Sequence, residues 1–176
     1  PTFFSPDQLK RMIQEITSGC EIAEEYEFSF EGHPNNTTKE HLQSLYDVGF
    51  RRVSFGVQDY DPIVQLAINR VQPYENVQQV HEWSKEIGYT SISHDIVFGL
   101  PHQKLDGMLE TIELTTKLRP DRLAFYSYAH VPWIKGVGSR GFDENDLPSN
   151  EEKRELYEEG KKALESKGYF EIGMDH

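Results

Sequence analysis

The sequence has almost no cysteine and no long apolar run. Cys20 is the single cysteine among 176 residues, so the chain can form no internal disulfide and cannot supply a set of thiolate metal ligands. This favours a reducing compartment, and we expect a cytoplasmic protein. The apolar runs are too short to cross a bilayer, no charged-then-apolar leader opens the chain, and the mean hydropathy is −0.67. We therefore expect no membrane partner.

Basic residues are few relative to acidic ones. The chain has 18 Lys and Arg residues against 30 Asp and Glu residues, which gives a net charge of −12. A protein that binds a phosphate backbone needs a basic face, so this balance argues against a nucleic-acid partner. Much of the acidic charge lies in segments 21–27 and 151–165, which also carry lysines or read as helix surface. We interpret both segments as solvated faces.

Several catalytic motifs are missing as well. The sequence has no G-x-S-x-G motif, no Gly-rich phosphate loop and no His-x-His pair. Histidines near expected strand ends raise the possibility of a metallohydrolase barrel; they are His33, His94, His102, His130 and His176. Such a site needs converging imidazoles and a carboxylate, and strand alternation should turn His94 away from Asp95. We therefore expect no histidine-built metal site.

What the sequence does contain is a regular alternation of strand and helix patterns. We expect strands in segments 25–34, 51–59, 91–101, 121–131 and 169–174, and helices in segments 5–19, 37–49, 61–70, 75–88, 105–118 and 149–168. Strand followed by helix is typical of βαβ units, which build a parallel sheet with outer helices. The length predicts a single α/β domain over residues 1–176, with a long loop over 133–150.

Polar residues at the ends of the expected strands are the candidate ligand contacts, because parallel α/β folds bind ligands outside the carboxyl ends of their strands. Asp95 is the most informative of them, since its apolar neighbours predict burial. An ionised carboxylate in such a place needs hydrogen-bond donors. Ligand hydroxyls could supply them, and so could backbone amides of a neighbouring loop.

The other candidates also have structural alternatives. Glu31 precedes the loop 32–36, where solvent could satisfy its carboxylate. Gln58 can donate to and accept from a ligand, or it could cap the helix that follows it. Arg70 follows Asn69 at the end of an expected helix, where the helix dipole favours a cation in any case. Taken singly, the structural interpretation is favoured for Arg70.

Six segments taken together resemble one family. They are FEGHP, RRVSFGVQDYD, AINRVQPYE, HDIVFGLPHQ, YAHVPWIK and YFEIGMDH, and they run in order along essentially the whole chain. In this order they resemble the oxygen-independent coproporphyrinogen III oxidases, radical S-adenosylmethionine enzymes of haem biosynthesis. GVQ with GLP alone would indicate only a wider group that includes a haem chaperone. The NR pair, YAHVP and IGMDH resemble the branch that oxidises coproporphyrinogen more than they resemble the chaperone branch.

The resemblance implies a fold, a reaction and partners. The fold would be a partial (β/α) barrel, of which this chain would be a truncated, central to C-terminal piece. Enzymes of this family cleave S-adenosylmethionine at a [4Fe-4S] cluster, and the resulting radical takes a hydrogen from a propionate of coproporphyrinogen III. Loss of carbon dioxide and an electron leaves a vinyl group, and two such steps give protoporphyrinogen IX. A reducing protein would serve the cluster.

The resemblance also implies site residues, though none in a catalytic role. Glu31, Gln58, Arg70, Asp95 and the backbone of Ala129 match family contacts to S-adenosylmethionine. Carboxylates can accept from ribose hydroxyls and the amino group, and the arginine fork suits the methionine carboxylate.

The chain departs from the family pattern in three places. It has no C-x-x-x-C-x-x-C cluster motif, it begins with PT where the family reads GGTP, and GHP replaces a DP-type turn. We therefore expect a piece of a longer protein that cannot hold the cluster alone.

Two other functions stay open at this point. One is the haem-chaperone relative, which keeps the barrel but transfers haem. The other is an unrelated α/β-barrel enzyme that uses Glu31 and Asp95 as an acid/base pair.

Overall fold

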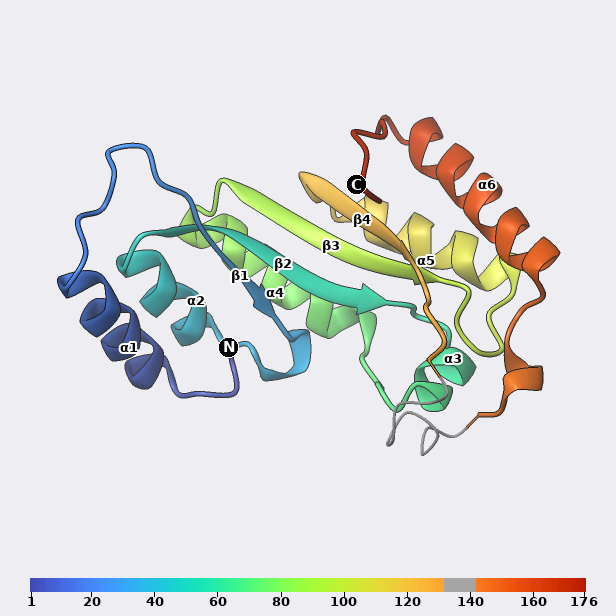
Figure 1. The fold of residues 1–176 in the computed structure, drawn as a ribbon, viewed down its shortest axis with the longest axis horizontal. Coiled ribbons are helices and arrows are strands. Elements are labelled where there is room, and N and C mark those ends of the chain that lie inside the picture. The colour runs from blue at the N-terminus through green and yellow to red at the C-terminus, as the bar shows by residue number, and fades with distance from the viewer. Residues whose placement is uncertain (132–141) are drawn as a thin grey trace. The chain divides into compact units, whose positions relative to one another are not determined.

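The structure is a computed structural model that describes residues 1–131 and 142–176. These residues form a four-stranded parallel sheet whose strands alternate with helices (Figure 1). The strands follow one another in the sheet in chain order, and they are β1 (Phe28–Gly32), β2 (Phe50–Gln58), β3 (Ser91–Phe98) and β4 (Arg122–Ser127). The expected parallel α/β architecture is confirmed.

Six α-helices occupy the segments where the sequence predicts them. They are α1 (Pro6–Ser18), α2 (Lys39–Asp47), α3 (Pro62–Ala67), α4 (Tyr74–Ile87), α5 (Leu105–Lys117) and α6 (Asn150–Ser166), with short 3-10 turns η1 (Pro34–Asn36) and η3 (Glu144–Asp146) among the described residues. Ser5 and Ser149 each close a capping box, which satisfies backbone amides that a helix start leaves without partners. The loop expected over 133–150 lies partly outside the described residues.

The strand expected over 169–174 is wrong. This segment is irregular, because Gly173, Met174 and Asp175 all have positive φ angles, of 106°, 51° and 64°. Such angles turn the chain and are incompatible with an extended strand. The segment still lies beside β4 at one point, where the Phe125 amide donates to the Asp175 carbonyl over 2.8 Å.

The described residues fall into two compact units. The first unit comprises Pro1–Gly56, Glu75–His94 and Pro120–Arg122, and the second comprises Val57–Tyr74, Asp95–Arg119 and the described part of Leu123–His176. In the first unit α1 packs on α2, and the parallel register places Phe30 opposite Val53 and Glu31 opposite Ser54. Its core gathers Leu42, Leu45 and Phe55, which are at most 1% exposed.

The second unit has a core of its own between its strands and the helix pair α5 and α6. Ile96 and Phe98 from β3 contact Leu123 and Phe125 from β4 in one buried cluster. The Phe98 and Phe125 ring centroids lie 4.7 Å apart, within the range of favourable aromatic pairs. This core fixes the carboxyl end of β3, the strand on which Asp95 lies.

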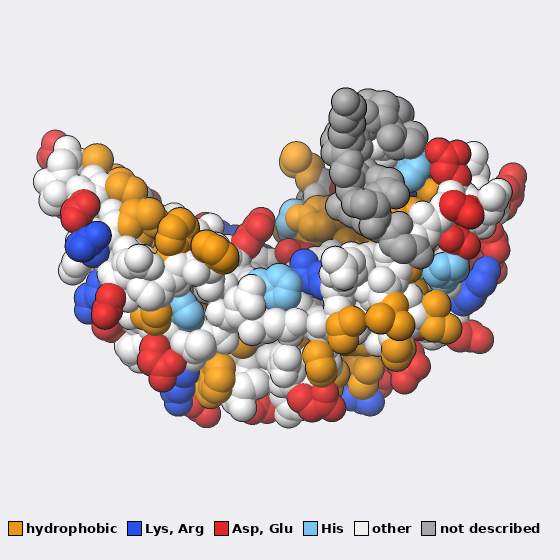
Figure 2. Space-filling model, turned by 90° about the horizontal axis from the view of Figure 1, so that it is seen from below, with side chains coloured by type: hydrophobic (Ala, Val, Ile, Leu, Met, Phe, Trp, Pro, Cys, Tyr) orange, Lys and Arg blue, Asp and Glu red, His pale blue; other side chains and the backbone are white. Residues whose placement is uncertain are grey.

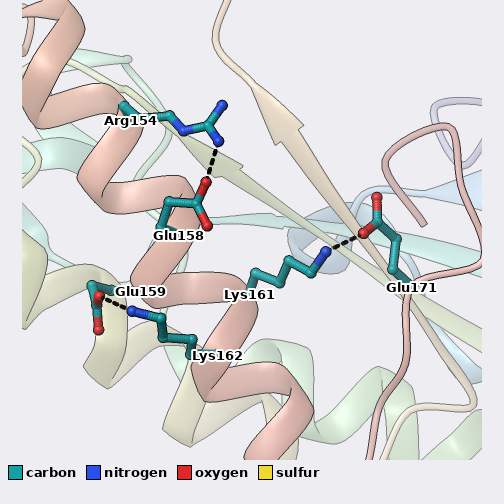
Figure 3. A network of polar contacts seen from close by, with 6 residues as sticks. All are labelled: Arg154, Glu158, Glu159, Lys161, Lys162 and Glu171. Atoms are coloured by element: carbon teal, nitrogen blue, oxygen red, sulfur yellow. Dashed lines mark hydrogen bonds and ion pairs between the residues drawn. The ribbon is translucent and has the colours of Figure 1, made fainter.

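The outer face of α6 is solvated, as the sequence predicts for segment 151–165. Figure 3 shows ion pairs along it between Arg154 and Glu158, between Lys162 and Glu159 at 2.6 Å, and between Lys161 and Glu171 at 2.5 Å. Acidic and basic side chains are likewise intermixed over the face drawn in Figure 2. Within the described residues, no helix has the length and apolar character needed to cross a bilayer.

Candidate functional site

Gln58 lies at the carboxyl end of β2, in the second unit, and its side chain is half-buried. Its φ angle is 66°, in the left-handed region that costs a residue with a Cβ atom about 1–2 kcal/mol. Backbone strain of this kind concentrates at ligand sites. The strand therefore ends in a backbone turn that a glycine would adopt more easily, yet a glutamine occupies the position.

Arg70 and Asp95 lie close enough in the second unit to interact electrostatically. Burial lowers the pKa of the Arg70 guanidinium from its ordinary value, and the Asp95 carboxylate opposes that effect. Both side chains are half-buried, so each charge keeps access to a ligand. Sequence reasoning on Arg70 alone favoured a helix-end cation, and in the structure the charge of Asp95 acts on that cation.

Ala129 follows β4 and belongs to the second unit too. The neighbouring Tyr128 amide donates to the Phe98 carbonyl at the end of β3 over 2.8 Å, which places this backbone beside the β3 carboxyl end. Ala129 itself is exposed. Glu31 belongs to the first unit, where it is exposed on β1 and lies in register with Ser54.

A buried polar network behind Gln58 and Arg70 was missed by the sequence analysis. Its members Asp59, Gln65, Gln72, Gln103 and Thr111 are at most 6% exposed. Burial raises the pKa of the Asp59 carboxyl, although hydrogen bonds oppose this shift. The one available sequence signal is that two glutamines flank Arg70 within an apolar stretch, at positions 65 and 72.

The histidines and the cysteine form no metal site in the part of the chain that the structure describes. His94 is fully buried and its Nε2 atom lies 3.1 Å from Nδ1 of His81. Its side chain is on the buried face of β3 while Asp95 is half-buried, as strand alternation predicts. Cys20 is exposed, and no group of three or more potential ligands gathers among the described residues.

Comparison with known proteins identifies the family. Residues 3–115 match the model of the Radical SAM superfamily. The chain belongs to this superfamily. Membership excludes an unrelated α/β-barrel enzyme, the third possibility that the sequence left open.

Close relatives are coproporphyrinogen III oxidases. The chain is 48% identical to an oxygen-independent coproporphyrinogen III oxidase of Helicobacter pylori and 38% identical to that of Synechocystis, and in each case all of this chain aligns with 38% of the relative. It also matches the solved coproporphyrinogen III oxidase (HemN) of Escherichia coli with a TM-score of 0.93 and 34% identity, over 99% of this chain and 40% of that one. The resemblance and the expected partial (β/α) barrel fold are confirmed.

The chain spans less than half the length of these relatives, so its fit to each cofactor must be tested on its own residues. Arg70 and Asp95 supply a cation and a carboxylate, which fit the zwitterionic methionine part or the ribose of S-adenosylmethionine. A [4Fe-4S] cluster needs several thiolates, and these 176 residues have one cysteine. The residues present therefore fit S-adenosylmethionine and do not fit the cluster.

Proposed function

We propose that the complete gene product containing these 176 residues is an oxygen-independent coproporphyrinogen III oxidase. It converts two propionates of coproporphyrinogen III to vinyl groups and uses S-adenosylmethionine. The observation that carries the proposal is that 48% identity to the Helicobacter pylori oxidase extends over all of this chain. We place residues 1–176 in one cytoplasmic domain that has neither nucleic acid nor a membrane as a partner.

In this proposal the second unit binds one S-adenosylmethionine. Arg70 binds the methionine carboxylate, because a guanidinium matches a carboxylate with two parallel hydrogen bonds. Asp95 accepts from a ribose hydroxyl or the amino group, and the Gln58 amide can both donate and accept. Ala129 contributes its backbone. Glu31, which lies in the first unit, is proposed as a separate contact to S-adenosylmethionine. When bound, S-adenosylmethionine supplies the group that abstracts hydrogen from the substrate.

The cluster and its reducing protein require residues beyond these 176. One cysteine among these residues cannot hold the cluster. The contribution of this chain is to bind and orient S-adenosylmethionine at the strand ends.

The test of the function is an anaerobic assay of the complete gene product. It is incubated with coproporphyrinogen III, S-adenosylmethionine and a reductant, and the porphyrinogen is analysed by mass spectrometry. We expect loss of two carboxyl groups as carbon dioxide, and no loss when S-adenosylmethionine is omitted.

The haem-chaperone function is the other outcome that this assay distinguishes. A gene product that leaves coproporphyrinogen III unchanged and binds haem stoichiometrically would overturn the proposal and support the chaperone.

A further inference from the structure

The side chain of Gln65 closes the loop that carries Arg70. Gln65 lies on α3 and is 6% exposed. Its Nε2 atom donates to the Asp59 carbonyl over 2.9 Å and to the Gln72 carbonyl over 2.8 Å. Its Oε1 atom accepts from the Gln72 amide over 3.0 Å. The two residues that flank segment 60–71, which comprises α3 and the turn with Arg70, are thus tied to one side chain.

The backbone of Gln65 and the side chain of Gln72 also contact Arg70 directly. The Arg70 amide donates to the Gln65 carbonyl over 2.8 Å, and Nη2 of Arg70 donates to Oε1 of Gln72 over 3.4 Å. Gln72 is fully buried, and its Nε2 atom lies 3.5 Å from the Val57 carbonyl, one residue before Gln58. The two glutamines therefore link the backbone of Arg70 to the end of β2.

Asp59 extends this link to the end of β3. Its carboxylate accepts from the Asp61 amide over 2.7 Å, from the Thr111 hydroxyl over 3.0 Å and from Nε2 of Gln103 over 2.6 Å. Oε1 of Gln103 in turn accepts from the Gly99 amide over 2.7 Å. All these residues belong to the second unit, so a continuous set of buried hydrogen bonds joins the loop of Arg70 to the strand of Asp95.

A network of this kind fixes geometry more than it adds stability. Buried hydrogen bonds replace bonds to water, so their net contribution to folding is small, whereas a satisfied polar network specifies one arrangement. The element it fixes here is a loop with an exposed Asn69 in the left-handed region, at a φ angle of 53°. A loop with a strained residue of this kind holds one conformation only when the residues that surround it make contacts with it.

We propose that Gln65 is a positioning residue for the ligand arginine. By holding the two ends of segment 60–71, it keeps the Arg70 guanidinium where it meets the carboxylate of S-adenosylmethionine. This inference rests on the proposed function, because it takes S-adenosylmethionine as the ligand of Arg70. Gln65 contacts no ligand itself and acts through Arg70.

The test is a double-mutant cycle on S-adenosylmethionine binding by the complete gene product. Gln65→Met keeps the length of the side chain and removes its three hydrogen bonds. Gln78→Met is the matched control, because Gln78 is a glutamine on α4 that bonds Glu82 in an exposed position. We expect Gln65→Met to raise Kd about 10-fold, the control to leave it unchanged, and Arg70→Ala to abolish any further effect of Gln65→Met.

A kinetic readout separates positioning from general loss of structure. In the anaerobic assay, Gln65→Met should raise KM for S-adenosylmethionine and leave kcat within about 2-fold, because the lost contact is made equally in the ground and transition states. If Gln65→Met does not fold, Gln65→Asn carries the same test. It keeps the amide, but its side chain is too short to bridge both loop ends.

The outcomes are distinct for the inference and for the proposed function. Unchanged binding in Arg70→Ala would overturn the assigned ligand site, and with it this inference. Weaker binding in Arg70→Ala with unchanged binding in Gln65→Met would overturn the inference alone. Equal effects of Gln65→Met with and without Arg70 would also overturn it, because Gln65 would then act independently of the arginine.

Discussion

Gln58 and Asn69 share a left-handed backbone, with φ angles of 66° and 53°. Gln58 ends the strand β2, and Asn69 directly precedes Arg70, so both strained residues lie at proposed ligand contacts. Asparagine tolerates this conformation better than most residues, whereas glutamine has no such advantage. A glutamine at this position is best explained by what its side chain does.

Replacing Gln58 by glycine should therefore separate stability from binding. We expect Gln58→Gly to leave the free energy of unfolding unchanged or raise it by up to about 1 kcal/mol. Glycine relieves the backbone strain of the folded state, and the greater entropy that it gives the unfolded chain offsets part of this gain. Binding of S-adenosylmethionine should weaken, because the side-chain amide is lost. Denaturant unfolding and equilibrium dialysis measure the two effects.

The matched control is Arg119→Gly, which changes an exposed residue with a φ angle of 57° in the turn after α5. It should show the same effect on unfolding and leave binding unchanged. Binding by Gln58→Gly equal to that of the parent would remove Gln58 from the site.

His94 is a second residue whose environment has a measurable consequence. Burial lowers the pKa of His94 well below its usual value, and the nearby His81 and Lys85 act in the same direction. In the unfolded chain, His94 has the ordinary histidine pKa of about 6.5. Below that pH the unfolded state binds a proton that the folded state does not, so the free energy of unfolding falls as the pH falls.

His94→Gln should flatten this pH dependence. The parent should lose up to about 1.4 kcal/mol of unfolding free energy per pH unit from this residue below about pH 6.5, and the variant should lack that part. Urea unfolding at about pH 7.5 and about pH 5.5 measures the slope. His176→Gln removes an exposed histidine and is the control. A slope in His94→Gln equal to that of the parent would contradict the assignment.

The sequence predicted Gln58 and Asp95 as candidate contacts, because parallel α/β folds bind ligands outside the carboxyl ends of their strands, whereas Arg70 became a candidate only through the resemblance to the family. It did not predict Gln65 and Gln72. Their role depends on a loop that folds back between helix α3 and the end of β2, and no periodic pattern encodes such a contact. The nearness of Arg70 and Asp95 is likewise a tertiary fact.

Among the elements, α6 depends on a glycine where it meets the sheet of the second unit. A Cβ atom at Gly160 would lie 2.5 Å from Cζ of Phe125 and 3.2 Å from Cε of Met108. Phe125 is buried against Phe98 and Tyr157, so its ring has little room to move. The small residue sets how closely α6 approaches β4.

Gly160→Ala should therefore destabilise the protein despite the better helix propensity of alanine. Overpacking costs about 1–3 kcal/mol, and the propensity gain is at most about 1 kcal/mol, so the free energy of unfolding should fall. Glu155→Ala, an exposed position on the same helix, is the control and should change it little. Thermal or urea unfolding measures both, and an increase in stability for Gly160→Ala would refute this packing.

Element type was predictable wherever the helix and strand periods were clear, as in α4 and β2. Segment 169–174 shows where that reasoning fails. Its apolar residues alternate with period two, but Phe170 and Ile172 are 79% and 69% exposed and the turn at 173–175 breaks the chain direction. A strand pattern needs a partner strand, and the single hydrogen bond to Phe125 does not supply one.

For the whole molecule, the chain combines a superfamily fold with an incomplete set of cofactor ligands. The match to the Radical SAM superfamily covers residues 3–115, and the oxidases it resembles are longer, since this chain aligns with 38% of each. The 176 residues contain Arg70 and Asp95 but only one cysteine. In the proposal, the side chains that contact S-adenosylmethionine therefore lie among these 176 residues, and the thiolates that hold the cluster do not.

The 176-residue polypeptide, reconstituted with iron and sulfide, should show no iron–sulfur absorption. One exposed thiol cannot hold a four-iron cluster that needs several thiolate ligands. Iron analysis after desalting gives the stoichiometry. Four iron atoms bound per chain would contradict this expectation.

Equilibrium dialysis of the complete gene product against S-adenosylmethionine shows whether the strand ends of the second unit bind this ligand. Asp95→Asn should weaken binding roughly 10-fold to 100-fold. The substitution removes a charge-assisted hydrogen bond to the ligand, and it also removes the negative charge that acts on Arg70. Asp106→Asn, an exposed change on α5, should bind like the parent. Equal affinity of the parent and a folded Asp95→Asn variant would show that Asp95 does not contact S-adenosylmethionine.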